Sequence, residues 1–223
     1  MLILASASPR RRELLTQAGY EFRVHPAHIP EDPLPNEDPI AYVTRLARQK
    51  AEAVYKEIAG AETDAGASAL ASETWKGAAP GLKSLIVLGA DTTVTLDNHI
   101  LGKPENNEDA ARMLRLLSGR THRVITGVSL VSAASSEGAA ACAVSTAAEV
   151  TAVQFLSISE EEIQAYIATG EPADKAGAYA IQGRAARWIP RIEGCYFNVV
   201  GLPIALVSTL LDAQRETQLD AQP

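Results

Sequence analysis

The first fifteen residues constrain the fold and the function of this chain more than any other stretch. Residues 2–4 are apolar, as at the start of a buried strand, and residues 5–8 are all small. Pro9 stands where a first helical turn would begin, with Ser8 before it as an N-cap. Residues 10–12 are all arginine. The pattern predicts a strand, a turn of small residues and a helix N-terminus that carries three guanidinium groups.

A helix N-terminus with adjacent arginines is suited to bind an anion. Its free N–H groups and the positive end of its dipole favour negative charge. Guanidinium groups match the oxygens of phosphate in a bidentate manner. We therefore predict a site for a phosphorylated small molecule. A solvated basic face at a helix start explains the same residues, and the stretch by itself does not separate the two interpretations.

Composition restricts the class of protein. The chain has 223 residues, 47% of them hydrophobic, which suffices for one large α/β domain or two small ones. Its net charge of −7 argues against a general binder of nucleic acid or of anionic membranes, because such surfaces need a basic excess. We expect no signal peptide and no membrane span, which needs about 18 apolar residues. Cys142 and Cys195 form neither a disulfide framework nor a zinc motif, which favours a reducing, cytoplasmic compartment.

Asp91 is the strongest catalytic candidate. It lies within residues 85–96, where an apolar run, Gly-Ala-Asp and β-branched residues predict a central strand. A carboxylate in such a strand is unfavourable unless it is paired or binds a cation. The alternative is an aspartate at a strand end or turn, because Asp97 and Asn98 just beyond predict a turn.

Three charged residues elsewhere could also face a ligand. Glu31 lies in a proline-rich loop that follows a predicted strand, where functional carboxylates are common, although a solvated loop charge is the alternative. Lys50 lies at the edge of the apolar stripe of a predicted amphipathic helix over residues 40–59, so it could point into a cleft. Lys103 lies in a Gly-Lys-Pro corner.

Residues 173–183 form a second unusual stretch. They are mostly small, with glycine at the end, and they carry Asp174, Lys175 and Gln182. This composition lets backbone approach a ligand closely. The Gln182 amide has one acceptor and one donor group, which suits the edge of a base, and a simple turn glutamine is the alternative.

Two stretches are predicted to be inserted surface loops. Residues 60–82 and 133–141 are rich in small residues and have no periodicity. The second loop connects two predicted long strands, residues 121–132 and 144–155, in a hairpin. Residues 188–192 predict a further short strand.

Five separated motifs together resemble one known family. They are Ala5 to Leu15 (ASASPRRRELL), Leu88 to Thr92 (LGADT), Leu101 to Pro104 with Leu117 to His122, Gly170 to Gly183 (GEPADKAGAYAIQG) and Asn198 to Pro203 (NVVGLP). Several long motifs in the expected order are more specific than one glycine pattern. By these motifs the chain resembles the Maf family of nucleotide pyrophosphatases, once called septum formation inhibitors.

The resemblance implies one α/β domain over residues 1–223. It implies an extended mixed sheet flanked by helices, with two lobes around a cleft, as in inosine triphosphate pyrophosphatases. It also implies cleavage of a nucleoside triphosphate to the monophosphate and pyrophosphate with a divalent cation, Mg²⁺ or Mn²⁺. A housecleaning or division-related role and a homodimer are further implications.

The resemblance assigns expected roles to residues of this chain. Asp91 corresponds to the proton acceptor of the family. The phosphate-cleft residues of the family correspond to Ser8, Arg10, Arg11, Lys50 and Lys103. The residues associated with preference for dTTP and UTP correspond to Arg10, Thr92 and Gln182.

Further expectations complete the set. Lys103 acts beside Asp91 in catalysis, and Lys175 binds substrate. Asp91 and Glu31 are the expected metal ligands, although the acidic motif of the family is matched only loosely around Glu31. Arg12 falls at a variable position and is expected to face solvent. Two other functions remain open: a same-fold pyrophosphatase for inosine triphosphate or 7-methyl-GTP, and a non-enzymatic nucleotide-binding regulator of division.

Overall fold

A computed structural model describes residues 1–64, 85–133 and 142–220 of the chain. The elements follow one another as β1 (Leu2–Leu4), α1 (Pro9–Gln17), β2 (Phe22–Val24), α2 (Pro39–Asp64), β3 (Ile86–Leu96), β4 (His99–Leu101), α3 (Asn107–Leu117), β5 (Thr121–Ala133), β6 (Cys142–Gln154), α4 (Glu160–Ile167), the 3₁₀ turns η2 (Glu171–Asp174), η3 (Ala176–Ala178) and η4 (Arg184–Trp188), β7 (Arg191–Glu193), α5 (Tyr196–Val200) and α6 (Ile204–Asp220). Within this part of the chain, no helix is long and apolar enough to cross a membrane.

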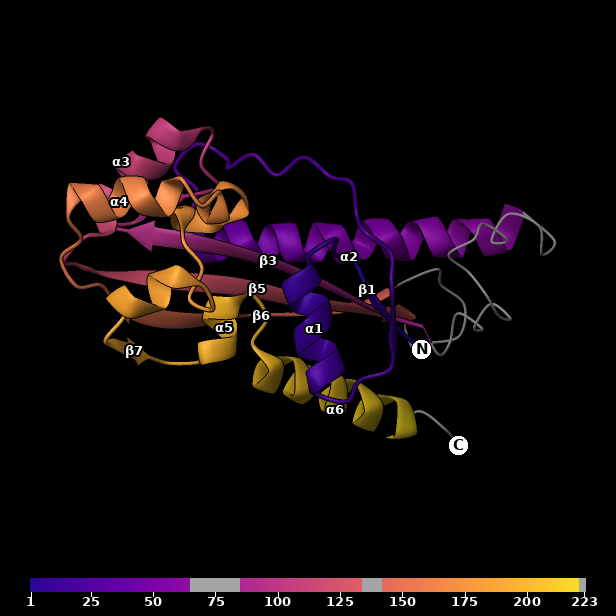
Figure 1. Cartoon of the computed structure of the whole chain (residues 1–223). Helices are drawn as coiled ribbons and strands as arrows, with labels where there is room; N and C mark the ends of the chain where they lie inside the picture. The colour runs from indigo at the N-terminus through magenta and orange to yellow at the C-terminus, as the bar shows by residue number, and fades with distance from the viewer. Residues whose placement is uncertain (65–84, 134–141, 221–223) are drawn as a thin grey trace.

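The described strands form one seven-stranded mixed sheet. Its order is β2-β1-β3-β5-β6-β7, and β4 pairs with β3. β1 is parallel to both its neighbours, whereas the remaining pairs are antiparallel. Helices cover both faces, with α2 along one and α5 and α6 along the other (Figure 1). The expected extended mixed α/β sheet flanked by helices is confirmed.

A gap in the strand pairing of β3 divides the molecule into two lobes. β5 pairs along one edge of β3 for nearly its full length. On the other edge β1 pairs only with residues 86–88, and β4 pairs only with residues 94–96. Residues 89–93 therefore have no strand partner on that edge within the described chain. Asp91 lies at the centre of this gap, between the β1 lobe and the lobe built around α3 and α4.

Two glycines allow α2 to lie directly on the sheet. A Cβ atom at Gly89 or Gly127 would lie well under 3.0 Å from the backbone oxygen of Ala47 or Val43, respectively. Because neither strand has a side chain at that point, helix backbone and strand backbone come into contact. The close approach brings Lys50, on the next turn of α2, next to β3.

The side chains of β3 alternate between two cores, as a strand requires. Val87 packs with Ile3 and Val54 on the α2 face, whereas Leu88 packs with Leu15 and other residues on the α6 face. Asp91 lies on the α2 face and Thr92 on the opposite one, so the gap in β3 presents polar side chains to both sides.

Local chemistry explains the start of α1 and the turn after β3. Ser8 is the N-cap of α1 with Pro9 in the first turn, as predicted. Asp97 and Asn98 both have positive φ, 51° and 63°, and form the predicted turn, here a two-residue hairpin between β3 and β4. The long hairpin of β5 and β6 is confirmed as well.

Two predictions differ from the structure. α2 continues through Asp64, so residues 60–64 are helical and not part of a loop. The short strand predicted at residues 188–192 is present but begins later, as β7. Trp188 ends η4, and β7 begins only after Pro190, whose nitrogen cannot donate in a strand ladder. Ala133 belongs to β5, and the rest of the two predicted insertions, residues 65–82 and 134–141, lies outside the described residues.

Candidate active site

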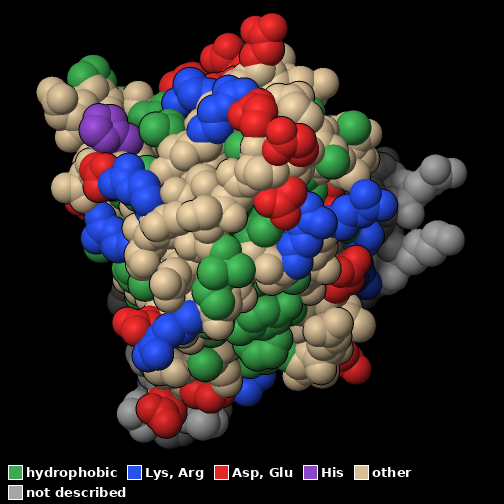
Figure 2. Space-filling view, turned by 60° about the vertical axis from the view of Figure 1, so that its left-hand side comes forward, with side chains coloured by type: hydrophobic (Ala, Val, Ile, Leu, Met, Phe, Trp, Pro, Cys, Tyr) green, Lys and Arg blue, Asp and Glu red, His purple; other side chains and the backbone are tan. Residues whose placement is uncertain are grey.

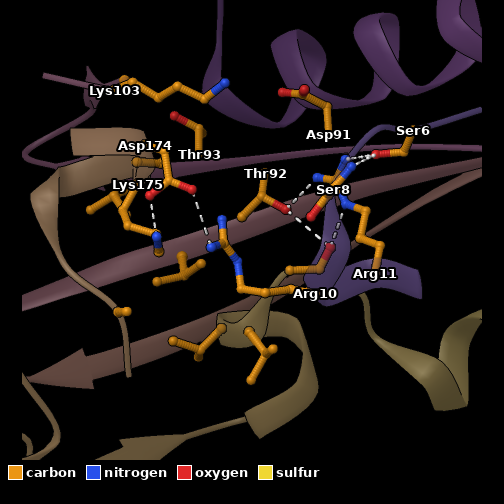
Figure 3. A pocket seen from close by; sticks show the side chains of 18 of the residues that line it. Ser6, Ser8, Arg10, Arg11, Asp91, Thr92, Thr93, Lys103, Asp174 and Lys175 are labelled. Carbon is orange, nitrogen blue, oxygen red and sulfur yellow. Dashed lines mark hydrogen bonds and ion pairs between the residues drawn. The ribbon is translucent and has the colours of Figure 1, made fainter. Parts of the chain in front are cut away.

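A cleft of about 450 Å³ opens at the gap in β3 (Figure 3). Its volume lies in the range of small-molecule sites. Its walls come from the β1–α1 turn, the loop after β2, β3, the corner after β4, the η2–η3 segment and the end of α5. All the predicted site residues line it: Ser8, Arg10, Arg11, Glu31, Lys50, Asp91, Thr92, Lys103, Lys175 and Gln182.

Lys50 bridges the two carboxylates of the α2 side. Its Nζ lies 2.7 Å from Oδ1 of Asp91 and 2.6 Å from Oε1 of Glu31. The side chains of Lys50 and Asp91 are 8% and 11% exposed. The ammonium group therefore compensates for placing a carboxylate within a strand. Only Oδ1 of Asp91 accepts this bond, which leaves Oδ2 for a water molecule.

The charges around Glu31 keep it ionised. Partial burial acts to raise the pKa of Glu31. The hydrogen bond and charge of Lys50 lower it more, with smaller contributions from Lys103 and Arg11. The pKa of Glu31 therefore lies below its ordinary value. The carboxylates of Asp91 and Glu31 thus both point toward the ammonium group of Lys50.

This arrangement suits a divalent cation completed by substrate. Oxygen ligands are the ones that Mg²⁺ and Mn²⁺ prefer, and Mg²⁺ is usually held by one or two carboxylates together with substrate phosphates. Among the described residues, no group of three or more His, Cys, Asp or Glu side chains could hold a metal ion. Asp91 and Glu31 could hold such an ion only with ligands from phosphate or water.

Arg11 is bonded almost entirely to the protein. Its Nε donates to the Gly201 carbonyl at 2.8 Å, and Nη1 donates to Ser6 Oγ at 3.0 Å and to the Ala90 carbonyl at 2.8 Å. Nη2 donates to Thr92 Oγ1 at 3.0 Å. A guanidinium group has five N–H donors, so one remains for the cleft. Burial lowers the pKa of Arg11, and the charge of Asp91 acts in the opposite direction.

These four bonds join three segments of the chain at β3. Ser6 belongs to the β1–α1 turn, Ala90 and Thr92 flank Asp91 on β3, and Gly201 follows α5. Arg11 thus fixes the position of β3 relative to the N-terminus of α1. The Arg10 guanidinium, by contrast, is bonded to one side chain, the carboxylate of Asp174.

Three cations point into the more open part of the cleft. Arg10 Nη1 lies 3.5 Å from Oδ2 of Asp174, and Lys175 pairs with the other oxygen of that carboxylate. Lys103 is exposed and extends toward Asp91 (Figure 3). Arg12 is exposed, as expected. The cleft therefore contains cations that solvent and ligands can reach, in addition to the buried Lys50 and Arg11.

The start of α1 also faces the cleft. Ser8 is its N-cap, but the Ser8 side chain makes no capping hydrogen bond. The hydroxyl and the first N–H groups of the helix can therefore serve an anion.

The remaining wall suits a nucleobase. Thr92 Oγ1 contacts Thr126 Oγ1 at 2.9 Å and accepts from Arg11. Gln182 is exposed at the rim of the cleft. Between these polar groups the lining is apolar, with Ile181 and Val199. An apolar surface with a few placed polar groups is typical of a site for a planar base.

Comparison with known proteins decides the family. The chain matches the family model of Maf-like proteins over residues 1–214. The chain belongs to the Maf family. It is 50% identical to a dTTP/UTP pyrophosphatase of Koribacter versatilis over 210 residues, covering 94% of this chain and 92% of that protein. It is 46% identical to a protein of the same name from Moorella thermoacetica, with 94% and 93% coverage. A third protein of that name, from Thermococcus onnurineus, is 44% identical, with 93% and 94% coverage.

Two residues that hold the Maf cleft in shape were not predicted from the sequence. The Tyr42 hydroxyl donates to the Glu31 carbonyl at 2.9 Å. Arg45 donates to both carboxylate oxygens of Glu37, at 2.6 and 2.7 Å, and to the Asp32 carbonyl at 3.2 Å. Burial, with the charges of Asp91 and Glu31, raises the pKa of Tyr42 to about 12, so the hydroxyl keeps its proton. Their i, i+3 spacing on α2 was a visible signal, but only the fold brings the loop against that helix face.

Asp174 is the other residue whose role the sequence left open. Its position among small residues was noticed, but its pairing with Arg10 joins residues 164 positions apart. A contact of that sequence separation has no local signature.

Proposed function

We propose that this Maf protein hydrolyses dTTP and UTP to the nucleoside monophosphate and pyrophosphate. One observation carries the proposal: Asp91 lies in the gap of β3, bonded to Lys50, and faces a cleft with accessible cations. The names of the relatives, dTTP/UTP pyrophosphatases over more than nine-tenths of the chain, support the same substrate class.

Asp91 acts as the general base. Lys50 donates to Oδ1 and orients the carboxylate, and Oδ2 accepts a proton from the attacking water. The water oxygen bonds to the α-phosphorus. The bond from that phosphorus to the bridging oxygen breaks, and pyrophosphate leaves with the bonding electron pair. The proton of the water passes to Asp91.

Arg10, Lys103 and Lys175 neutralise the triphosphate and the charge that develops on the leaving pyrophosphate. The N-terminus of α1 adds backbone donors near Ser8. Such preorganised donors commonly supply the largest part of the rate enhancement in reactions of this type. Arg11 contributes at most one N–H, so its main role is to hold Ala90 and Thr92 on either side of the base.

Asp91 and Glu31 would hold a Mg²⁺ or Mn²⁺ ion together with phosphate oxygens. When bound, such an ion neutralises phosphate charge and makes the bound water more acidic. The convergence of the two carboxylates on Lys50 supports this assignment.

Gln182 and Thr92 read the base. The edge of uracil or thymine presents a carbonyl and an N–H, which an amide can match. The apolar residues Ile181 and Val199 would contact the faces of the ring.

We further propose that the enzyme works in the cytoplasm, as a homodimer, without nucleic acid or membrane as a partner. Both cysteines, Cys142 and Cys195, are free thiols, which suits a reducing compartment. On the face drawn in Figure 2, basic and acidic side chains alternate and no continuous basic area appears. Light scattering after gel filtration tests the dimer.

One experiment tests the function and the role of Asp91 together. Pyrophosphate release from dTTP, UTP, CTP, inosine triphosphate and 7-methyl-GTP is measured with Mg²⁺ and with Mn²⁺, for the wild type and for Asp91→Asn. We expect preference for dTTP and UTP in the wild type, and a loss in kcat on the order of 10²–10³ in the variant, with nucleotide binding retained. Near-normal turnover by the variant contradicts the assignment of the base, and preference for a purine contradicts the substrate class.

A further inference from the structure

Two of the accessible cations in the cleft are paired with a carboxylate of the protein itself. Arg10 lies 3.5 Å from one oxygen of Asp174, and Lys175 pairs with the other. Figure 3 shows the carboxylate between the two cationic groups. Both oxygens of Asp174 therefore occupy donors that the proposed function assigns to phosphate.

The backbone that carries Asp174 is held in place. Asp174 ends η2, and the N–H of Lys175 donates to the Pro172 carbonyl at 3.1 Å. At the start of the same turn, the Glu171 carboxylate accepts from the Tyr166 hydroxyl at 2.7 Å and from the N–H of Arg184 at 3.1 Å. The Asp174 side chain, by contrast, is 64% exposed. The carboxylate can therefore turn toward water without any movement of the turn.

The same pairing joins the two lobes. Arg10 is on α1, beside β1, whereas η2 packs against α3 and α4. Burial acts to raise the pKa of Asp174, but Lys175, and to a smaller extent Arg10, lower it more, so the pKa lies below its ordinary value. Asp174 is therefore an anion over the pH range in which a triphosphate is fully charged.

We propose that the Asp174 carboxylate is an internal competitor for the phosphate chain, and that it sets the selectivity for triphosphates. In the nucleotide-free enzyme it occupies the anion position between Arg10 and Lys175. A triphosphate carries enough charge to displace it, whereas monophosphates and inorganic phosphate displace it poorly. After hydrolysis the carboxylate returns as the products leave. This inference rests on the proposed function, since phosphate groups must enter this cleft.

A purely structural role for Asp174 predicts the opposite result. If the carboxylate only held Arg10 in position for the substrate, its removal would weaken phosphate binding. If it competes, its removal strengthens phosphate binding, most visibly for the ligands with least charge. The sign of the change therefore separates the two roles.

The test uses Asp174→Asn and Asp174→Ala in the full chain. Calorimetry measures the Kd of pyrophosphate and of thymidine monophosphate, and steady-state kinetics measures the inhibition of dTTP hydrolysis by both. We expect both ligands to bind about three- to tenfold more tightly to the variants, the size of one or two exposed ion pairs. The gain shrinks when Arg10→Gln is added, because one of the released cations is then missing.

Asp97→Asn is the matched control. Asp97 is 66% exposed and pairs with Arg120 at 2.6 Å, so it resembles Asp174 in exposure and partner but lies in the β3–β4 turn, away from the cleft lining. We expect Asp97→Asn to leave the Kd of both ligands unchanged. We also expect the thermal stability of Asp174→Asn to fall by no more than that of Asp97→Asn.

The outcomes are distinguishable from failure of the proposed function. If the wild type hydrolyses dTTP but the Asp174 variants bind pyrophosphate equally or more weakly, the inference is overturned and the function stands. If the wild type neither releases pyrophosphate from dTTP nor binds pyrophosphate, the proposed function fails and the inference fails with it.

Discussion

Arg10 and Arg11 are adjacent residues of the same type, yet from the structure we expect different consequences for replacing each by lysine. Arg11 is 8% exposed and donates four hydrogen bonds to three segments. A lysine carries its three donors on one nitrogen and cannot reach acceptors that the guanidinium fork reaches. At least two of the four bonds would be lost. Ser6 Oγ also accepts from the Ser8 N–H, and the Gly201 carbonyl also accepts from Thr92, so a bond lost there costs about 1 kcal/mol, whereas an unsatisfied Ala90 carbonyl costs about 1–3 kcal/mol. Arg11→Lys should therefore lower the free energy of unfolding by about 2–4 kcal/mol.

Arg10→Lys is the control. The Arg10 side chain is 27% exposed and makes one ion pair at 3.5 Å. Pairs of this kind contribute about 0–1 kcal/mol, so the free energy of unfolding should fall by less than about 1 kcal/mol. Because Lys still carries the charge, phosphate binding is weakened and not abolished.

Urea unfolding followed by circular dichroism measures the stability difference, and pyrophosphate release measures the kinetic one. We expect Arg11→Lys to lower kcat, because Ala90 and Thr92 hold the backbone of Asp91 on either side. Arg10→Lys should mainly raise KM for dTTP. Equal losses of stability in the two variants, or a loss below about 1 kcal/mol for Arg11→Lys, would refute the argument that Arg11 is a positioning residue.

Three further predictions concern the base, the helix–sheet contact and the buried histidine. Gln182→Glu should lower kcat/KM for dTTP and UTP more than it weakens pyrophosphate inhibition, and an equal fall in kcat/KM for every nucleotide would show that Gln182 does not read the base. Gly127→Ala should destabilise the fold by about 2–4 kcal/mol, because the new Cβ on β5 would overlap the carbonyl of Val43 on α2. Gly60 is on α2 as well but has open space where a Cβ would lie, so Gly60→Ala should be neutral or slightly stabilising. The urea midpoints of the two variants test this difference. Burial lowers the pKa of His122 from 6.5 to about 4, so between these pH values the unfolded chain binds a proton that the folded chain does not. The free energy of unfolding therefore falls as the pH is lowered from about 6.5 toward 4, by about 2 kcal/mol between pH 7 and pH 5. Denaturation curves of His122→Gln should lack this part of the pH dependence.

Much of the local structure could be predicted because its causes are local. Ser8 followed by Pro9 starts α1 by capping and by the fixed φ of proline. Asp97 and Asn98 tolerate positive φ and turn the chain into a hairpin. The strand predicted at residues 188–192 begins only at Arg191, because the apolar residue at the start of the predicted range has another cause. Trp188 lies at the end of a 3₁₀ turn, and its ring packs against Phe155 and Tyr166 in the core. An apolar residue at this position therefore does not indicate a strand.

The candidate site shows the same division. The residue types were identifiable: a carboxylate in a strand at Asp91, arginines at a helix start, and an amide among small residues at Gln182. The residues to which these side chains bond could not be identified from the sequence. The bridge from Lys50 to Asp91 spans 41 positions and depends on α2 resting on glycine at Gly89. The loop contacts of Tyr42 and Arg45 depend on the same placement.

The amino-acid sequence shows which side chains the chain can offer to a ligand: arginines at a helix start, a carboxylate within a strand and an amide among small residues. These follow from side-chain types and short-range backbone preferences, which act over a few residues. The difference between the two adjacent arginines comes from the folded arrangement of the chain. Arg11 points to the gap between β1 and β4 and donates to the carbonyls of Ala90 and Gly201, whereas Arg10 points across the cleft to Asp174. That difference arises from strand pairing and helix packing between distant segments, because hydrogen-bond acceptors left open by one part of the fold must be satisfied by another.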